Sequence, residues 1–192
     1  MGQYGFYFDM TACIGCRTCQ IACKDKNNLK PGVLFRQVKT FEVGKFPKAD
    51  LYHYSGTCNH CENPKCVEGC PTTAMHKLAN GIVAHDPEKC IGCRYCTWNC
   101  PYGAPKYVEE LKIVRKCDMC LDLVEQGLNP TCVDACPMRV LKWGEIDTLE
   151  AEYGNESTKD LPILPVSSAT NPSLLVKPKN AARQAGFRQK EV

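Results

Sequence analysis

One run, Cys90–Pro101, constrains the fold of this chain more than any other stretch. It reads Cys-Ile-Gly-Cys-Arg-Tyr-Cys-Thr-Trp-Asn-Cys-Pro, with three evenly spaced cysteines and a fourth after three intervening residues. A tight turn can direct the first three thiolates at one object, but it cannot place the fourth on the same object. In runs of this form the fourth cysteine binds a second [4Fe–4S] cluster. The run therefore predicts a partner run elsewhere in the chain.

The whole sequence is built of such runs, because all 16 of its cysteines fall into four groups of four. The groups are Cys13, Cys16, Cys19, Cys23; Cys58, Cys61, Cys66, Cys70; Cys90, Cys93, Cys96, Cys100; and Cys117, Cys120, Cys132, Cys136. Asp9–Cys16 repeats the pattern of Asp86–Cys93, which ends in Cys-Ile-Gly-Cys. A disulfide framework gives no reason for repeated C-x-x-C pairs. Structural zinc uses such pairs, but normally two separated ones rather than three thiolates in one short turn.

Exchange of the fourth cysteine between paired groups predicts four ligand sets. The sets are Cys58, Cys61, Cys66, Cys100; Cys90, Cys93, Cys96, Cys70; Cys13, Cys16, Cys19, Cys136; and Cys117, Cys120, Cys132, Cys23. Because cysteine fills every position, we expect four [4Fe–4S] clusters and no open iron position for a substrate. The protein is therefore interpreted as a non-catalytic electron-transfer protein, and no catalytic residue is predicted.

A hairpin signal predicts the first of two cluster modules. Asn80-Gly81 lies between two short apolar stretches, which is the strongest short-range signal for a β-hairpin. Leu51–Tyr54 and Ala104–Tyr107 are expected to form the opposite pair of strands. Residues 51–107 would then form a complete two-cluster module with small antiparallel hairpins.

The first and fourth cysteine groups are left to form a second module with each other. Pairing of strand Tyr4–Phe8 with strand Val140–Trp143 would close it. Its parts are residues 1–50 and 108–146, with an extra hairpin at about 32–50. The expected fold class is thus α+β, with two ferredoxin-like two-cluster modules, one inserted in the other.

Residues 147–192 differ from the rest in composition. Asp147-Thr-Leu-Glu150 resembles a capping box and predicts a short helix. After Gly154 the sequence is polar and rich in proline, with Leu174–Val176 as its main apolar anchor. We expect an extended arm that lies over a neighbouring subunit or is disordered.

Charge and hydropathy exclude several function classes. The formal charge is +3 without cofactors, but each cluster with its thiolates adds about two negative charges, which removes support for nucleic-acid binding. Basic residues beside the cysteines would offset that charge or are ordinary surface residues; they are Arg17, Lys24, Lys65, Lys89, Arg94, Lys116 and Arg139. No apolar run is long enough to span a bilayer, and no export signal occurs. Alone the protein is expected to stay in the cytoplasm, so membrane contact or export requires another subunit.

Three side chains within the cysteine groups have weaker predicted roles. His60 is interpreted as a surface histidine, with an N–H group that tunes a cluster through sulfur as the alternative. Tyr95 and Trp98 are expected to shield a cluster by packing.

Several motifs resemble the iron–sulfur (beta) subunit of dimethyl sulfoxide reductase-like molybdopterin oxidoreductases. They are the order of the four groups, Cys-Asn-His-Cys at 58–61, Cys-Ile-Gly-Cys-Arg-Tyr-Cys at 90–96, Cys-Pro-Tyr-Gly-Ala-Pro at 100–105, Lys-Pro-Lys-Asn at 177–180 and the opening Gln-Tyr-Gly-Phe. The cysteine pattern alone also fits the corresponding subunits of polysulfide, tetrathionate and nitrate reductases and of formate dehydrogenase.

The resemblance implies a complex for anaerobic respiration with a molybdopterin (Mo or W) catalytic subunit and an integral-membrane anchor that oxidises quinol. The cluster of Cys13 and Cys136 would face the catalytic subunit, and that of Cys90 and Cys70 the membrane. It also implies membrane association through partners on the extracytoplasmic face, by export together with the catalytic subunit. Some nitrate reductase relatives replace the residue that matches Cys93 and hold [3Fe–4S] there; this sequence keeps cysteine.

Two alternatives remain at this point. One is a cytoplasmic polyferredoxin-like donor or acceptor for a soluble dehydrogenase or hydrogenase. The other is a zinc-stabilised interaction or nucleic-acid module.

Overall fold

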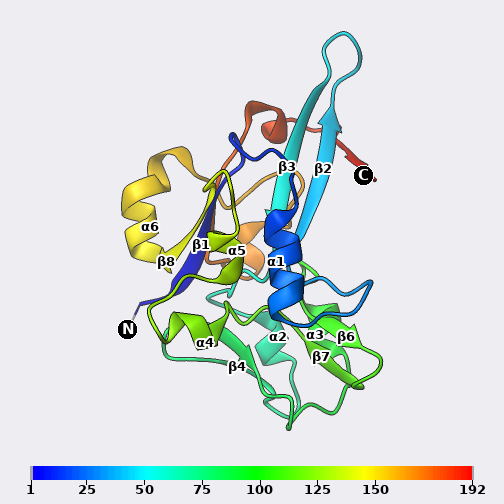
Figure 1. The fold of residues 1–192 in the computed structure, drawn as a ribbon, viewed down its shortest axis with the longest axis vertical. Helices are drawn as coiled ribbons and strands as arrows, with labels where there is room; N and C mark the ends of the chain where they lie inside the picture. The colour runs from blue at the N-terminus through cyan, green and yellow to red at the C-terminus, as the bar shows by residue number, and fades with distance from the viewer. Residues whose placement is uncertain (1, 192) are drawn as a thin grey trace.

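A computed structural model describes residues 2–191 and shows an α+β protein with small sheets and short helices (Figure 1). Its strands are β1 (Tyr4–Asp9), β2 (Gln37–Val43), β3 (Asp50–Gly56), β4 (Met75–Lys77), β5 (Val83–His85), β6 (Lys106–Val108), β7 (Ile113–Arg115), β8 (Leu141–Glu145), β9 (Leu174–Lys177) and β10 (Arg188–Lys190). Its α-helices are α1 (Thr18–Lys26), α2 (Lys65–Glu68), α3 (Tyr95–Asn99), α4 (Leu121–Val124), α5 (Thr131–Asp134) and α6 (Ile146–Tyr153). Three 3₁₀ turns follow α6: η1 (Gly154–Glu156), η2 (Ser167–Ala169) and η3 (Asn180–Arg183).

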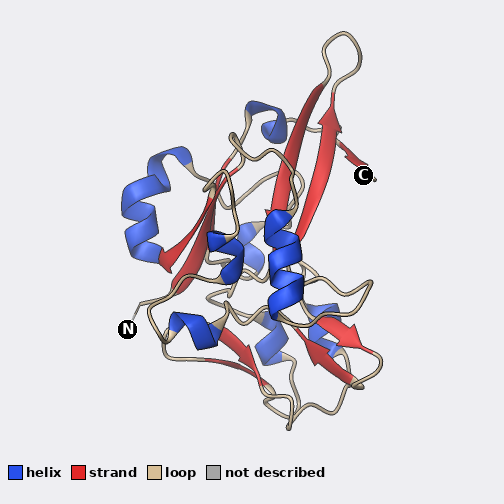
Figure 2. Ribbon diagram, in the orientation of Figure 1, coloured by secondary structure: helices blue, strands red, loops and turns tan. Residues whose placement is uncertain are grey.

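The sheets are small and separate. They have the strand orders β8-β1-β9, β10-β2-β3, β4-β5 and β6-β7. Figure 2 shows the helices as short segments among loops, and Figure 1 places β4, β6, β7, α2 and α3 together at the lower end of the molecule. Within residues 2–191, no helix has both the length and the apolar character that a bilayer span requires.

Strand β1 joins the start of the sequence to two distant segments. Phe6 lies opposite Trp143 of β8 in an antiparallel pair and opposite Leu174 of β9 in a parallel pair. Phe6 and Tyr7 point to opposite faces of the sheet, and both are buried, so this central strand is covered on both faces. The predicted pairing of Tyr4–Phe8 with Val140–Trp143 is confirmed.

Two other strand predictions have different outcomes. The hairpin at Asn80-Gly81 is confirmed by the antiparallel β4-β5 pair. The predicted pairing of Leu51–Tyr54 with Ala104–Tyr107 is wrong, because β3 pairs with β2 and β6 pairs with β7. Each of these strands has a partner close in sequence, and closing a short loop costs less conformational entropy than closing a long one.

The expectation of an extended arm over a neighbour is wrong for most of the segment after α6. Leu174, Leu175 and Val176 form β9, which occupies the second edge of β1, and all three are buried. Ala181 and Ala182 of η3 are also buried, and β10 pairs with β2. The predicted short helix is confirmed as α6. Contacts within the same polypeptide therefore replace the partner contacts that the composition seemed to require.

We expect this C-terminal segment to resist proteolysis in the isolated, cluster-loaded protein. Leu175→Asp should destabilise it by more than about 2 kcal/mol and expose it to protease, because the substitution buries an unpaired charge beside β1. Val166→Asp is the matched control, since Val166 lies in the same segment and is 67% exposed. Limited proteolysis with mass spectrometry measures the difference. Equal cleavage of the wild type and Leu175→Asp would contradict the packing of β9.

Candidate iron–sulfur centres

A common local layout positions the cysteines of all four groups. In each group the first two cysteines lie between elements and the third lies in a short helix: Cys19 in α1, Cys66 in α2, Cys96 in α3 and Cys132 in α5. Cys23 also lies in α1, and the remaining fourth cysteines, Cys70, Cys100 and Cys136, follow their helices closely. The sequence repeat is thus a repeat in structure.

The two Cys-Ile-Gly-Cys-Arg loops share a backbone conformation. Gly15 and Gly92 have φ of 69° and 68°, and the following Arg17 and Arg94 are also left-handed, at 62° and 65°. A Cβ atom on Gly92 would lie 2.3 Å from the Lys112 carbonyl oxygen. Glycine is required there because it permits positive φ and close backbone approach.

Set I consists of Cys13, Cys16, Cys19 and Cys136, whose side chains line one small hollow. Burial raises the pKa of the Cys13 thiol, and the other three thiols of the set raise it further. The Thr18 hydroxyl donates to Cys16 Sγ at 3.3 Å and lowers the pKa of that thiol. The four predicted thiols therefore lie together although Cys136 is far from the others in sequence.

Set II consists of Cys23, Cys117, Cys120 and Cys132, all of them buried. Burial raises the pKa of Cys23 to about 12, with Cys132 and Cys120 contributing. Burial also raises the pKa of Cys117 well above its usual value, and the thiols of Cys23 and Cys58 add to the shift. Cys117 thus connects set II to the group that contains Cys58.

Set III consists of Cys58, Cys61, Cys66 and Cys100. Burial raises the pKa of Cys66 to about 12, and the other three thiols of the set raise it further. Cys66 also belongs to a buried cluster that includes Cys96 and is packed against Cys70 and Cys90. Set III therefore adjoins set IV.

Set IV consists of Cys70, Cys90, Cys93 and Cys96, which line a second hollow. Burial raises the pKa of Cys96 to about 11, and the other three thiols add to that shift. The backbone N–H of Met75 donates to Cys70 Sγ at 3.3 Å. All four predicted members of this set therefore face one space.

The chemistry of these sets fits iron. All 16 cysteines are free thiols in the structure, and thiolate is a soft ligand typical of iron–sulfur clusters. Burial raises the pKa of several of these thiols, such as Cys23, Cys66 and Cys96, and so favours their protonated form. A coordinating thiol, by contrast, is deprotonated outright. In residues 2–191 no three Cys, His, Asp or Glu side chains converge tightly enough for one metal ion. The ligand assignments themselves stay predictions.

His60 differs from its predicted surface position. It is fully buried, and burial holds the pKa of its ring well below the usual value. Its Nδ1 accepts a hydrogen bond from the Val83 N–H at 3.1 Å, which leaves the proton on Nε2, 3.9 Å from Cys117 Sγ. The surface interpretation is wrong, and the hydrogen bond reaches set II rather than set III, whose cysteines flank His60 in sequence.

Two buried cations accompany the thiols. Lys116 is 5% exposed and donates to backbone oxygens of Val83 and Cys117. Of the seven cations expected to offset cluster charge, it is the one that is buried. Arg36 is 2% exposed, and sequence analysis missed it, because it lies far from any cysteine in sequence.

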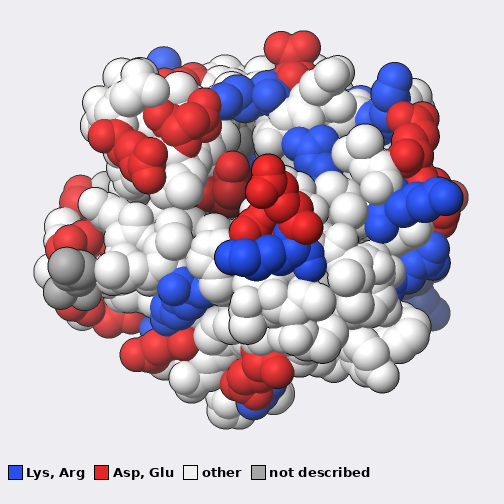
Figure 3. Space-filling model, turned by 90° about the horizontal axis from the view of Figure 1, so that it is seen from below, with Lys and Arg blue, Asp and Glu red and all other residues white. Residues whose placement is uncertain are grey.

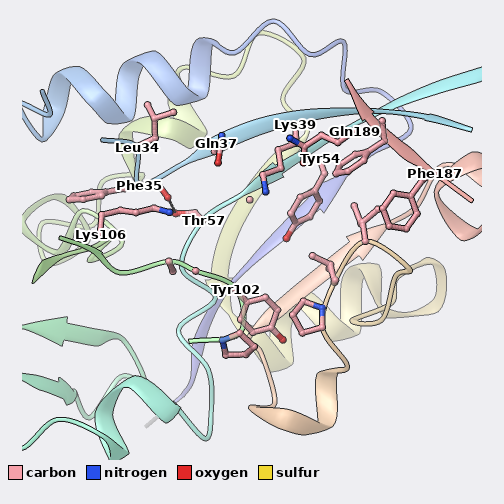
Figure 4. A pocket seen from close by; sticks show the side chains of 18 residues that line it. Leu34, Phe35, Gln37, Lys39, Tyr54, Thr57, Tyr102, Lys106, Phe187 and Gln189 are labelled. Carbon is pink, nitrogen blue, oxygen red and sulfur yellow. Dashed lines mark hydrogen bonds between the residues drawn. The ribbon is translucent and has the colours of Figure 1, made fainter. Parts of the chain in front are cut away.

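A cavity of about 410 Å³ lies beside the Cys100 loop, between β2, β3 and the C-terminal segment. Figure 4 shows Tyr54, Tyr102 and Phe187 around it together with two lysines, Lys39 and Lys106. Burial lowers the pKa of Lys106, and the charge of Lys39 lowers it further. The thiols of sets I and IV line their own smaller hollows elsewhere.

Comparison with known proteins gives consistent matches. Residues 49–146 match the family described as the 4Fe-4S dicluster domain. The sequence is 45% identical to the B chain of anaerobic dimethyl sulfoxide reductase from Haemophilus influenzae, over 97% of this sequence and 94% of that protein. It is 42% identical to the corresponding Escherichia coli protein, over 96% and 93%. The B subunit of sulfite dehydrogenase from Allochromatium vinosum is 37% identical over 79% and 72%.

We expect His60→Leu to lower the midpoint potential of one cluster, the one bound by Cys117, because an N–H donor to sulfur stabilises the more negative reduced state. His60→Gln, which keeps an N–H donor, should shift it less. His76→Leu is the control, since His76 Nδ1 bonds the Ala74 carbonyl oxygen instead. Redox titration followed by electron paramagnetic resonance measures the shifts. An unchanged spectrum and potential in His60→Leu would show that the contact does not influence a cluster.

Proposed function

This protein belongs to the family of dimethyl sulfoxide reductase B chains, which are electron-transfer iron–sulfur subunits with [4Fe–4S] clusters, and we propose that it holds four such clusters as one relay. The relay would carry electrons between a quinol-oxidising membrane anchor and a molybdopterin catalytic subunit. The similarity to these relatives over nearly the full length favours this over a polyferredoxin-like donor.

The observation that carries the proposal is the linear order of the four thiol sets. Cys19 of set I and Cys132 of set II belong to one buried cluster of side chains. Cys117 of set II and Cys58 of set III likewise share a buried cluster, and Cys66 of set III shares another with Cys96 of set IV. The order I–II–III–IV would place each cluster next to its successor.

The four thiol sets differ in their exposure to solvent. Set II is wholly buried, whereas set I contains the exposed Cys16, and three thiols of set IV are half-buried. In set III, Cys61 and Cys100 are also half-buried, so set II is the most shielded of the four sets. Electrons would enter and leave at sets I and IV.

Exposed apolar side chains surround both ends. Beside set I these are Ile14 and Met138, and beside set IV they are Ile91, Tyr95 and Trp98, with exposures of 43–71%. Exposed apolar patches mark protein–protein contact sites. We propose that set I contacts the catalytic subunit and set IV the membrane anchor, in line with the family resemblance. Figure 3 shows acidic and basic side chains interspersed on the lower face, with uncharged surface between them.

The residues of this protein would hold, orient and shield the clusters. Short helices present the third thiol of each set, and N–H and O–H donors face sulfur, as at Cys16, Cys70 and Cys117. The clusters, when bound, would accept and release single electrons. Such donors favour the charged form of sulfur and so support ligation.

We further propose that residues 51–107 form a two-cluster module inserted between residues 1–50 and 108–146. The β1-β8 pair, which joins the two ends of the outer module, supports this. The β2-β3 hairpin crosses the proposed boundary at residue 50, so the two modules would share a sheet. Association with a membrane on its extracytoplasmic face would come through the partner subunits.

We expect anaerobically purified protein to contain about sixteen iron and about sixteen sulfide per polypeptide, as four cubane clusters require. Cys93→Ser should convert one cluster to [3Fe–4S] or remove it, because oxygen suits this soft site poorly. Iron analysis and electron paramagnetic resonance measure both quantities. Iron near half the expected amount in a folded wild-type protein would contradict the four-cluster assignment.

The two docking surfaces can be tested separately in the assembled complex. Trp98→Lys should reduce quinol-dependent turnover roughly tenfold or more by weakening the anchor contact, while turnover with a reduced dye persists. Ile14→Lys should instead weaken co-purification of the catalytic subunit. Val166→Lys, at a similarly exposed apolar position in a different region, is the control. Equal behaviour of all three variants would contradict the proposed surfaces.

A further inference from the structure

Arg36 is a buried cation with no conventional counter-charge. Its side chain lies just before β2, is 2% exposed, and has its guanidinium carbon 5.0 Å from the centre of the Phe6 ring. Nη1 donates to the Ser55 carbonyl oxygen and to Ser55 Oγ, both at 3.1 Å. Across residues 2–191, no carboxylate lies within ion-pairing distance of it. A buried positive charge without a carboxylate partner is strongly unfavourable unless some other group that carries negative charge lies beside it.

Two of its donors also lack acceptors. Nε and Nη2 are buried, and neither has a hydrogen-bond partner in the part of the protein that the structure describes. Buried N–H groups in folded proteins are nearly always paired. The guanidinium therefore has an uncompensated positive charge and unpaired N–H donors at Nε and Nη2, and both can interact with a negatively charged group beside them.

The groups that face Arg36 are thiols of two different sets. They are Cys132, Cys19, Cys117 and Cys23. Burial opposes the charge of Arg36, but these four thiols outweigh it and raise the pKa of the guanidinium. Ser55 extends the contact, because its Oγ lies 3.4 Å from Cys19 Sγ while it accepts from Arg36. The other ionisable groups nearby are His60 and Tyr54, whose pKa values shift toward the neutral forms, mainly through burial.

We propose that Arg36 is the shared counter-charge of the clusters held by sets I and II, and that its free N–H groups are donors to the sulfur of those clusters. The inference rests on the proposed four-cluster function and adds a residue that acts on electron transfer between sets II and I. Arg36 acts on redox potential through the cluster environment and is a positioning and tuning residue.

The direction of the effect follows from charge. Reduction of a cluster by one electron adds one negative charge, so a buried cation stabilises the reduced state and raises the midpoint potential. Because Arg36 is shielded from solvent, salt and water screen this effect little. Both clusters of the pair should respond, whereas those of sets III and IV lie further along the relay and should not.

The test is redox titration, followed by electron paramagnetic resonance, of full-length protein in its assembled complex. Arg36→Met removes the charge and the N–H donors in a side chain of similar length. Arg36→Lys keeps the charge but loses the planar guanidinium group with its Nε and Nη2 donors. Arg139→Gln is the matched control, since Arg139 is an arginine three residues after Cys136 in sequence but is exposed. Cys136→Ser and Cys93→Ser identify the signals of sets I and IV.

We expect Arg36→Met to lower the potentials of two clusters, Arg36→Lys to lower them less, and Arg139→Gln to leave them nearly unchanged. Fully loaded Arg36→Met with unchanged potentials, or with equal shifts in all four clusters, would overturn the inference. If Arg36→Met loses about half of its iron, the iron content of Arg36→Lys decides between two readings. A normal iron content in Arg36→Lys supports the counter-charge, and the same loss of iron in both variants shows a purely structural role. A wild-type protein that does not hold four clusters would refute the proposed function instead. The failure of the proposed function is thus distinguishable from the failure of the inference about Arg36.

Discussion

Gathering negative sulfur in the interior of a small protein is the constraint on which the rest of this structure depends. Nine of the sixteen thiols are buried, and several belong to the same apolar clusters as the aromatic and aliphatic core residues. Burial disfavours charged sulfur, so the interior must supply compensating charge and donors. Arg36, Lys116 and His60 lie within this interior. The core is therefore partly ionic, and its stability depends on what the sulfur binds as well as on apolar contact.

The second organising feature is strand β1, which lies between two segments from the C-terminal part of the sequence. It pairs with β8 after the fourth cysteine group and with β9 in the C-terminal segment. These pairs bring Cys136 to Cys13 and cover the core beneath set I. Exposed apolar side chains lie near Cys13 and Cys136 and near Cys90 and Cys96, and the proposed relay would use these two regions for its partner contacts.

Local spacing accounts for the predictions that succeeded. Three thiols in one turn and a fourth beyond it led to the four predicted ligand sets, which stay predictions. The thiols of sets I and IV each line one hollow in the structure. The Asn80-Gly81 hairpin and helix α6 were also predictable, because turn and helix signals act over a few residues. The pairing of β1 with β8 followed by elimination, since neither strand had another cysteine group to serve.

The sequence by itself thus determined the cluster type and the family, both of which depend on residues close in sequence or on repeated motifs. Only the tertiary structure decided where the C-terminal segment lies. The free edge of β1 can pair with any suitable strand, and nothing in the four residues of β9 indicates that they pair with β1. Tertiary structure also decided the burial of His60 and Arg36. Their positions depend on strands and loops that are far apart in sequence and meet only in the folded protein. Desolvation and the charge of nearby sulfur act on these side chains there, and the residues next to them in sequence give no sign of it.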